Sequence, residues 1–481
     1  MIELPALSVT WTLVLLVLTL LYIYGVWPHG FFKKLGIPGP RPCYLYANCA
    51  KKYGKVWGIY DGRLPILMVT DLEMIKVIMV KECYSNFINR RKRTTGLAGP
   101  FADGIIMVQD ERWKRMRSTL SPYFTSGRLK EIFPIYILYL IRNKHCFYSR
   151  VVGPYSLDVV TSSSFSVDID SINKADDPFV TNVKKFIQFN MFNPLFLLIL
   201  LFPSIAIILK KMGVTLFSKS AMDFFYSAVK KIKDEHNKES DGRVDFLQLM
   251  LQNQIPGDHF GDTDEQPAKG LTDHEILSQS LVFILGGYET TSTTLTFLLY
   301  NLATNPDCLE KLVEEIDTNF PPDTPITYDA LMKMDYLEMA INESMRLLPT
   351  APRLERSSKK TVEINGVTIP KDTLVGIPTY VLCRDPQLWE SPDEFRPERF
   401  SPESKSVINQ YAFLPFGLGP RNCIGMRFAL MIMKILVVKL LQNFSVETCK
   451  ETQIPLEMNA AFQPKVPITL KFIPRSHKAK Q

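Results

Sequence analysis

Long apolar runs separated by polar turns dominate this chain, and the first run is long enough to cross a membrane. Ala6–Trp27 holds 22 residues without a charge and ends in aromatic residues that suit a membrane interface. Lys33 and Lys34 follow the run and only Glu3 precedes it, so the positive-inside rule places the body in the cytosol. A cleaved signal peptide is the alternative, but the run is too long for one and lacks a small-residue cleavage pattern. We therefore predict a membrane anchor over residues 1–30.

A proline-rich segment follows the anchor. Prolines stand at positions 38, 40 and 42. They predict a stiff, extended connector over residues 31–42, because proline fixes one backbone torsion and favours extended chain. Residues 43–481 would then form the folded body.

The hydropathy pattern contains a second charge-free run, Phe186–Leu209. Its length would span a bilayer, but Pro194 and Pro203 divide it into short pieces. We favour short helices that dip into the membrane surface or cover an apolar pocket over a second membrane span.

Shorter patterns predict β-hairpins in an otherwise helical chain. Residues 55–71 indicate a hairpin that turns at Asp61-Gly62, and residues 362–370 indicate another that turns at Asn365-Gly366. Residues 257–270 are polar and predict a loop. The expected fold is mainly α with small β-sheets.

Residues 271–306 predict one very long helix. Thr272 and Glu275 have the spacing of a capping box at its start, and Asn305-Pro306 closes it. Its centre is weak, since Gly286 and Gly287 each cost about 1 kcal/mol relative to alanine.

The weak centre of this helix allows two interpretations. The glycines would let something lie close to the backbone, or they would form a notch for helix packing. Thr290 can bond back to a carbonyl and open the helical ladder. Glu289 in this apolar stretch needs a partner or a role in moving protons.

Composition excludes several classes of protein. The 481 residues are 46% apolar, and the net charge of +7 is spread along the chain without the basic stripe of a nucleic-acid binder. The eight cysteines form no close-set pair and the six histidines no H-E-x-x-H motif. Zinc sites and a disulfide framework are therefore poor interpretations, and a reducing compartment is favoured.

One cysteine has unusual neighbours. Residues 413–430 read FLPFGLGPRNCIGMRFAL, which places Cys423 between a glycine-rich turn and an apolar helix. A cysteine thiolate is a strong ligand for haem iron, and it needs backbone amides around its sulfur. Arg421 offers a charge-assisted contact to an acidic group of a cofactor. A buried, inert thiol is the usual alternative for a single cysteine.

Several motifs in the correct order resemble those of the cytochromes P450. F-G-x-G-P-R-N-C-I-G at 416–425 resembles their haem-thiolate signature, and G-G-Y-E-T at 286–290 their oxygen-activating motif with Gly286 in place of the usual alanine. E-S-M-R at 343–346 and P-E-R-F at 397–400 match two further elements. The likeness covers nearly the whole chain and is greatest to family 3, subfamily A, the microsomal drug and steroid monooxygenases.

The resemblance implies a haem-thiolate fold with haem b and a role for each matching residue. Cys423 would be the axial iron ligand. The residues expected to hold the haem propionates are Arg90, Trp113, Arg117, Arg356 and Arg421. A buried structural charge cluster would consist of Glu343, Arg346 and Arg399. The proton relay would be formed by Thr290 and Glu289. The substrate pocket would be lined by Val282, Phe283, Leu285, Thr350, Ala351 and Leu354.

The implied activity is NADPH-dependent monooxygenation of large lipophilic molecules, such as steroids and xenobiotics, at the endoplasmic reticulum. The anchor would cross the membrane once and leave the catalytic domain in the cytosol. NADPH-cytochrome reductase would dock on the cysteine side, with cytochrome b5 as a second candidate partner. The positive charges expected there are Lys114, Arg115, Lys434 and Lys439.

Two rival functions and two departures from the family pattern remain. A haem-thiolate isomerase or dehydratase would need no proton relay, and a decayed relative would be a haem-free membrane scaffold. Residues near 42–50 and 135–155 are shorter than the family pattern, as if coding segments were lost. These stretches bear on how well the chain folds and loads haem.

Overall fold

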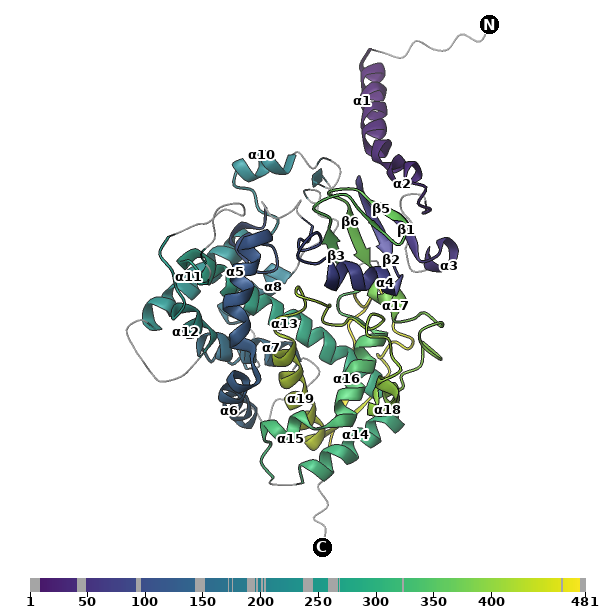
Figure 1. Cartoon of the computed structure of the whole chain (residues 1–481). Helices are drawn as coiled ribbons and strands as arrows, with labels where there is room; N and C mark the ends of the chain where they lie inside the picture. The colour runs from purple at the N-terminus through teal and green to yellow at the C-terminus, as the bar shows by residue number, and fades with distance from the viewer. Residues whose placement is uncertain are drawn as a thin grey trace.

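The computed structural model consists of a helical body, a small sheet at one end and a projecting N-terminal helix (Figure 1). It describes residues 9–40, 49–91, 97–142, 152–171, 173–174, 176–187, 195, 198–199, 202, 205–236, 245–257, 267, 269–321, 324–459 and 462–475. Parts of the predicted connector, of both shortened stretches, of the 186–209 run and of the 257–270 loop lie outside these residues.

The projecting helix is α1, Val9–Val26, and its side chains are exposed. It belongs to the one helical stretch, among the residues described, that is long and apolar enough to cross a membrane. The short helices η1 (Trp27–Gly30) and α2 (Phe31–Lys34) follow it.

The segment after α1 packs on the body. Phe32 is buried, the Tyr60 hydroxyl donates to the His29 carbonyl at 2.9 Å, and the His29 ring contacts the Gly62 carbonyl at 3.0 Å. The Gly58 amide donates to the Pro38 carbonyl. The prediction of an extended connector over residues 31–42 is therefore wrong for Phe31–Lys34, which form the helix α2 and bury Phe32, whereas Pro38 is held along the first strand.

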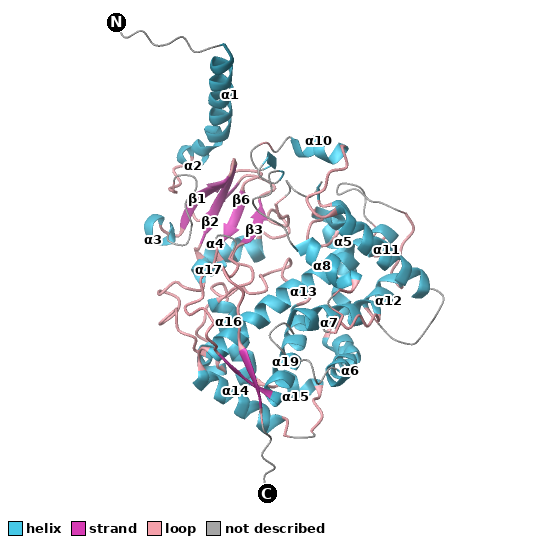
Figure 2. Cartoon of the chain, turned by 180° about the vertical axis from the view of Figure 1, so that it is seen from behind, coloured by secondary structure: helices cyan, strands magenta, loops and turns pink. Residues whose placement is uncertain are grey.

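The sheet beneath the anchor has the order β1-β2-β6-β3, with β2 and β6 parallel and the other pairs antiparallel. Its strands are β1 (Val56–Asp61), β2 (Leu64–Val69), β3 (Leu354–Ser357) and β6 (Leu374–Ile377). Two further sheets have two antiparallel strands each. One is the hairpin β4–β5 (Val362–Ile364 and Val367–Ile369), and the other pairs β7 (Phe444–Glu447) with β8 (Lys471–Pro474). Figure 2 shows the sheet on the α1 side of the helical body.

The structure corrects the position of one predicted turn. Asp61 still pairs with Leu64, so the first hairpin turns at Gly62-Arg63, one residue later than predicted. The second turn does lie at Asn365-Gly366, and both residues have the positive φ that a two-residue hairpin turn requires.

Helices form the rest of the body. The longer ones are α5 (Asp110–Leu120), α6 (Ser126–Arg142), α7 (Val152–Phe165), α8 (Pro178–Ile187), α10 (Ile205–Lys211), α11 (Lys219–His236), α12 (Phe246–Leu251), α13 (Asp273–Ala303), α14 (Pro306–Asn319), α16 (Asp335–Leu347) and α19 (Met426–Asn443). The short ones are α3 (Cys49–Tyr53), α4 (Leu72–Lys76), η3 (Val77–Lys81), η5 (Gly99–Asp103), η6 (Ser121–Phe124), α15 (Tyr328–Met332), α17 (Thr379–Leu382), η7 (Pro397–Phe400) and α18 (Pro402–Lys405).

The helix α13 runs through the centre of the body and contacts α7, α11, α16 and α19 (Figure 1). Its 31 residues confirm the predicted long helix, and the Thr272–Glu275 capping box is formed in both directions. The helix is continuous, so the prediction that Thr290 opens its ladder is wrong.

The second apolar run does not form one long helix in the part described. Helix α8 ends at Ile187, and α10 has only seven residues, too few to cross a membrane. Ile207 and Ile208 of α10 are exposed, and Phe202 stacks on Tyr24 of α1 at 5.1 Å. Phe202 of this run therefore lies beside the anchor, and α10 exposes apolar side chains of the same run.

We predict that Thr272→Ala lowers the free energy of unfolding by about 1–2 kcal/mol, because the buried hydroxyl accepts from the Glu275 amide at the start of α13. Urea unfolding of the purified protein measures the change. Thr272→Ser keeps the hydroxyl and is the matched control. Equal stability of the alanine and serine variants would show that this cap does not stabilise α13.

Candidate functional site

The loop before α19 holds Cys423 in a tight backbone turn. The Cys423 amide donates to the Phe416 carbonyl at 2.8 Å, and Gly417 and Gly419 both have positive φ. A side chain at Gly419 would collide with the Met79 carbonyl, so only glycine permits this approach. These contacts explain why glycines precede the cysteine.

The Cys423 thiol is largely surrounded by protein. Its residue surface is exposed, yet burial by the surrounding protein raises the pKa of its thiol. The Gly425 amide and the charges of Arg117 and Arg90 act in the opposite direction and favour the thiolate. The sulfur thus has the amide donor and positive surroundings of a thiolate ligand.

The centre of α13 also borders open space. A side chain at Gly286 would meet nothing within 4 Å, and Thr290, one turn later, is exposed. Gly287 is different, because a side chain there would collide with Val160 of α7. Gly287 therefore forms the notch for helix packing, and Gly286 leaves room beside the backbone, as the other interpretation requires.

The two polar residues of this turn are placed for proton chemistry. The Thr290 hydroxyl donates to the Gly286 carbonyl, as its position predicts. Burial raises the pKa of the neighbouring Glu289 carboxyl, so this carboxyl is protonated more readily near neutral pH. A hydroxyl and a readily protonated carboxyl thus lie next to each other in the sequence.

Four of the predicted cofactor-binding residues are arginines near Cys423. Arg117 donates to the carbonyl and side chain of Asn422 at 2.9 and 2.7 Å, and Arg90 contacts the Arg421 carbonyl at 3.4 Å. Arg421 donates to the carbonyls of Ile88, Ile105 and Val108. It also lies 4.4 Å from the centre of the buried Trp113 ring.

Among the residues described, none of these four arginines forms an ion pair with a carboxylate. Burial, followed by repulsion from Arg90, lowers the pKa of Arg356 to about 9 and that of Arg421 to about 8. The Arg356 Nε is enclosed without an acceptor among the described residues. Such a cluster fits a group that carries two carboxylates, which would relieve the repulsion and accept the unpaired N–H.

A second charged group, the predicted charge cluster, fixes the segment of residues 383–399 on α16. Glu343 and Arg346 make two parallel bonds of 2.8 Å, and the Arg399 Nε lies 3.1 Å from Glu343. Arg346 also donates to the carbonyls of residues 383, 392 and 394. All three side chains are buried, so the structure brings them together as a core cluster.

Comparison with known proteins identifies the family. A family profile described as Cytochrome P450 matches residues 29–472. The chain belongs to the cytochrome P450 family. It is 51% identical to Cytochrome P450 3A40 of Oryzias latipes over 495 positions, covering 97% of both chains. It is 49% identical to Cytochrome P450 3A29 of Sus scrofa over 494 positions, with 97% coverage of both.

This cytochrome P450 therefore uses haem whose iron is bound by a cysteine thiolate. The residues present fit that cofactor, since Cys423 has an amide donor and two arginines around its sulfur and the arginine cluster has no ion-pair partner among the described residues. The 495 aligned positions exceed the 481 residues of this chain, so the relative has residues that this chain lacks. This agrees with the shortened stretches noted in the sequence.

The predicted pocket residues of this cytochrome P450 differ in their surroundings. Val282 and Leu285 are buried, and the Thr350 hydroxyl lies 2.8 Å from that of Thr294 on α13. Phe283 packs in a ring cluster, 5.6 Å from Phe124 and 5.9 Å from Phe246. Ala351 is exposed, and Leu354, the first residue of β3, is half-buried.

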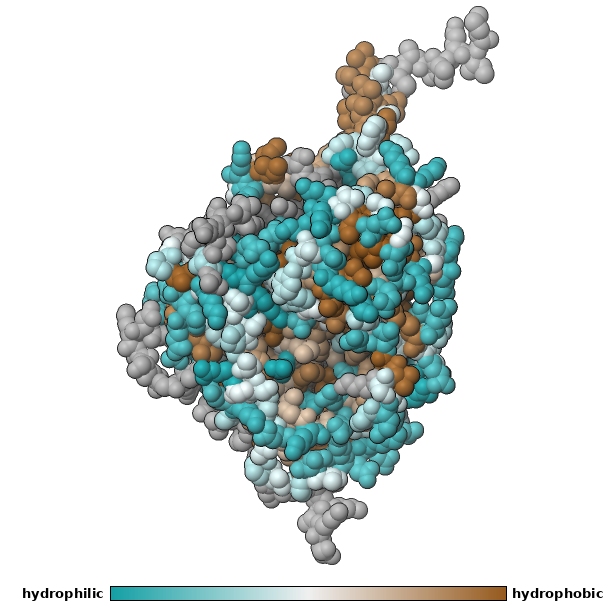
Figure 3. All heavy atoms as spheres, viewed as in Figure 1, coloured by the Kyte–Doolittle hydropathy of each residue, from teal (hydrophilic) through white to brown (hydrophobic). Residues whose placement is uncertain are grey.

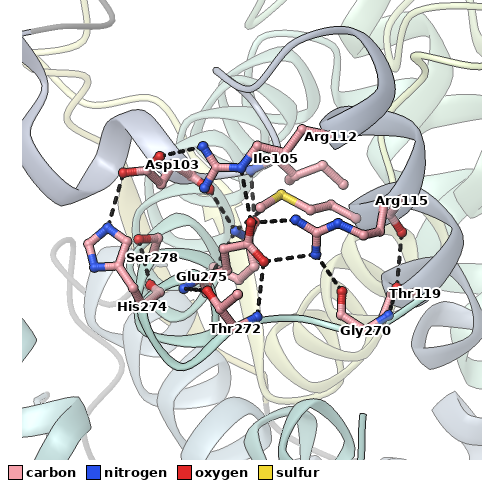
Figure 4. A network of polar contacts seen from close by, with 12 residues as sticks. Asp103, Ile105, Arg112, Arg115, Thr119, Gly270, Thr272, His274, Glu275 and Ser278 are labelled. Atoms are coloured by element: carbon pink, nitrogen blue, oxygen red, sulfur yellow. Dashed lines mark hydrogen bonds and ion pairs between the residues drawn. The ribbon is translucent and has the colours of Figure 1, made fainter. Parts of the chain in front are cut away.

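A buried network that the sequence analysis missed joins α5 to α13 (Figure 4). Glu275 accepts from Arg112 at 2.9 Å and from Arg115 at 2.6 Å. Asp103 of η5 accepts from Arg112 at 2.6 Å and contacts His274 at 3.0 Å. The same helix α5 carries Trp113 and Arg117, so this network helps to position two cofactor-binding residues.

Two of the four predicted docking charges are buried instead. Arg115 pairs with Glu275, and Lys434 contacts Glu338 at 3.2 Å and two backbone carbonyls. Both predictions of surface charge are therefore wrong, because each side chain compensates a carboxylate of another helix. Lys114 is partly exposed but paired with Glu111 at 2.6 Å, and Lys439 is half-buried.

We predict that the contribution of His274 to stability decreases as pH rises. The hydrogen bond that the His274 ring donates to Asp103 raises the pKa of His274, against opposing effects of burial and of the Arg112 charge. A histidine whose pKa is raised in the folded state contributes its full stabilisation below about pH 6.5, the pKa in the unfolded chain. This contribution is lost as the pH rises through the pKa of the folded state. His274→Gln should therefore lose about 0.5–1.5 kcal/mol at pH 6 and less at pH 8.

Urea unfolding of the variant and the parent at several pH values between 6 and 8 measures this difference. His29→Gln is the matched control, because the His29 ring contacts the neutral Gly62 carbonyl. A loss for His274→Gln that stays constant with pH would contradict the charged pair.

Proposed function

We propose that this protein is a membrane-anchored, NADPH-dependent monooxygenase that oxidises large lipophilic substrates, including steroids and xenobiotics. The observation that carries the proposal is the tight glycine turn that holds Cys423, with a cluster of buried arginines beside it that form no ion pair among the residues described. The relatives named Cytochrome P450 3A support the substrate class. Residues 43–481 would form the catalytic domain.

Each site residue has a role in this proposal. Haem, when bound, supplies oxygen activation. Cys423 would hold its iron, and Arg90, Arg117, Arg356 and Arg421 with Trp113 would hold its propionates. Thr290 and Glu289 would hold and move protons on the α13 side, because a hydroxyl and a carboxyl of raised pKa lie there.

The substrate pocket would lie against the same helix. Val282 and Leu285 give it apolar surface from α13, and Thr350, Ala351 and Leu354 lie on the segment that leads into β3. Phe283 would contribute through the aromatic cluster that it joins. Leu285 is smaller than the phenylalanine frequent in near relatives, so it would leave a wider space.

Anchoring at the endoplasmic reticulum would use two contacts. Helix α1, followed by Lys33 and Lys34, would cross the bilayer with the body in the cytosol. Figure 3 shows hydrophobic surface on α1 and on α10, at the same end of the molecule. Ile207, Ile208 and Met212 are more than half exposed and would enter the membrane surface.

Electrons would come from a partner protein. NADPH-cytochrome reductase is the proposed main donor, and cytochrome b5 a second one. Lys114 and Lys439 remain as candidate contacts on the cysteine side, since Arg115 and Lys434 are buried.

The reduced, carbon-monoxide-bound spectrum of the full-length protein tests the cofactor assignment. Cys423→Ser should abolish the thiolate-type absorption, because a neutral hydroxyl is a poor ligand for the iron. Cys383→Ser, at a buried thiol elsewhere, is the matched control and should retain it. A parent protein without this spectrum would favour a haem-free scaffold, and an unchanged spectrum in Cys423→Ser would refute the ligand assignment.

Thr290→Ala should keep the spectrum but lower product formation per NADPH consumed, with hydrogen peroxide released instead. A positioned proton donor is typically worth about 10²–10⁴-fold. Product, peroxide and NADPH are measured in one reconstituted mixture. Thr291→Ala is the matched control, because Thr291 is buried on another side of α13.

Unchanged coupling in Thr290→Ala would mean that Thr290 has no role in proton delivery. A parent protein that binds haem but rearranges or dehydrates substrate without NADPH would favour the isomerase or dehydratase instead.

A further inference from the structure

An open hollow of about 710 Å³ lies along the membrane anchor, away from the Cys423 site. The described residues that line it are Val17, Leu20, Leu21, Ile23, Tyr24, Trp27 and Arg63. Six of these seven come from α1 and the residue after it, and they are apolar or aromatic. The hollow is therefore an apolar groove with a single positive charge, which the hairpin turn of the sheet supplies.

Arg63 is held at this groove by Tyr24. Its guanidinium carbon lies 3.6 Å from the centre of the Tyr24 ring, a close cation–π contact. Its Nε is enclosed and has no acceptor among the residues that the structure describes. The guanidinium is thus positioned by the ring while part of its hydrogen-bonding capacity is unused.

The nearby carboxylate is already paired with other arginines. Asp61 stands two residues before Arg63, but it accepts from Arg91 at 2.7 Å and from Arg353 at 2.9 Å. No ion pair involves Arg63 within the described ranges. An external anion is therefore the natural partner of the Arg63 charge.

The dimensions of the groove match one leaflet of a bilayer. From Val17 to Trp27 a helix rises about 15 Å. This is half of the hydrocarbon core, which is about 30 Å thick. Arg63 and Trp27 lie at the end of α1 that leads to Lys33 and Lys34, where the proposed anchoring puts the headgroups.

We propose that this groove binds one phospholipid, with an acyl chain along α1 and the headgroup phosphate on Arg63. An anionic headgroup is favoured over choline, because the guanidinium already occupies the Tyr24 ring that would otherwise attract a quaternary ammonium. This inference rests on the proposed anchoring by α1. It is independent of the chemistry at Cys423.

Spin-labelled lipids test the proposal in phosphatidylcholine vesicles that contain the full-length haem-loaded protein. The motionally restricted fraction of labelled phosphatidylserine is compared with that of labelled phosphatidylcholine. The parent protein should prefer phosphatidylserine. Arg63→Gln should reduce this preference about tenfold, the change that corresponds to the loss of one hydrogen bond to a charged group.

Lys34→Gln is the matched control, because it removes the same charge from an exposed side chain at the same interface. It should retain most of the preference. Leu20→Trp fills the apolar part of the groove and should reduce the restricted fraction of both lipids. The carbon-monoxide spectrum verifies that each variant is folded.

Several outcomes would overturn the site. Equal losses in Arg63→Gln and Lys34→Gln would show general attraction to a charged surface, and loss of the preference on adding inorganic phosphate would show a simple anion site. A vesicle-bound parent protein without headgroup preference refutes this site alone. A protein that does not float with vesicles refutes the anchoring and the site together.

Discussion

Buried guanidinium charge is the constraint on which the rest of this structure depends. A buried charge without a counter-ion costs several kcal/mol, so each arginine in the core needs a partner. Glu275 neutralises Arg115 between α5 and α13, and Glu343 neutralises Arg346 between α16 and residues 383–394. Beside Cys423 the described residues provide mainly backbone carbonyls. In the proposed function the haem would supply the anions there, which would link loading of the cofactor to stability of the fold.

The helices α5 and α13 connect these charge systems. Arg112 and Arg115 of α5 form ion pairs with Glu275. Trp113 and Arg117 of the same helix contact Arg421 and Asn422 of the cysteine loop. Helix α13 carries the other part of the site in its middle turns, where Gly286 and Thr290 border open space. A single buried carboxylate at the start of α13 therefore holds the helix of Trp113 and Arg117 against the helix of Glu289 and Thr290.

Local signals in the sequence predicted local structure well, and distant partners explain the failures. The capping box of α13 and the Asn365-Gly366 turn depend on neighbouring residues, and both were right. The turn of the first hairpin lies one residue later than predicted, because Asp61 stays in the strand, where Arg91 and Arg353 bind it. The prediction of surface charges at Arg115 and Lys434 is wrong, because their ion-pair partners Glu275 and Glu338 are distant in the sequence. The residues around Cys423 were found through motif resemblance, and their roles stay predictions.

The packing of the segment after α1 determines how the body can move at a membrane. His29, Phe32 and Pro38 are all bonded to the first hairpin, so few free backbone torsions remain between the helix in the bilayer and the sheet. A flexible tether would let the body tumble, whereas this junction transmits the tilt of α1 to the whole domain. A lipophilic molecule dissolved in the membrane would then always meet the same side of the enzyme, and bilayer thickness, by setting the tilt, would set the height of that side above the lipid.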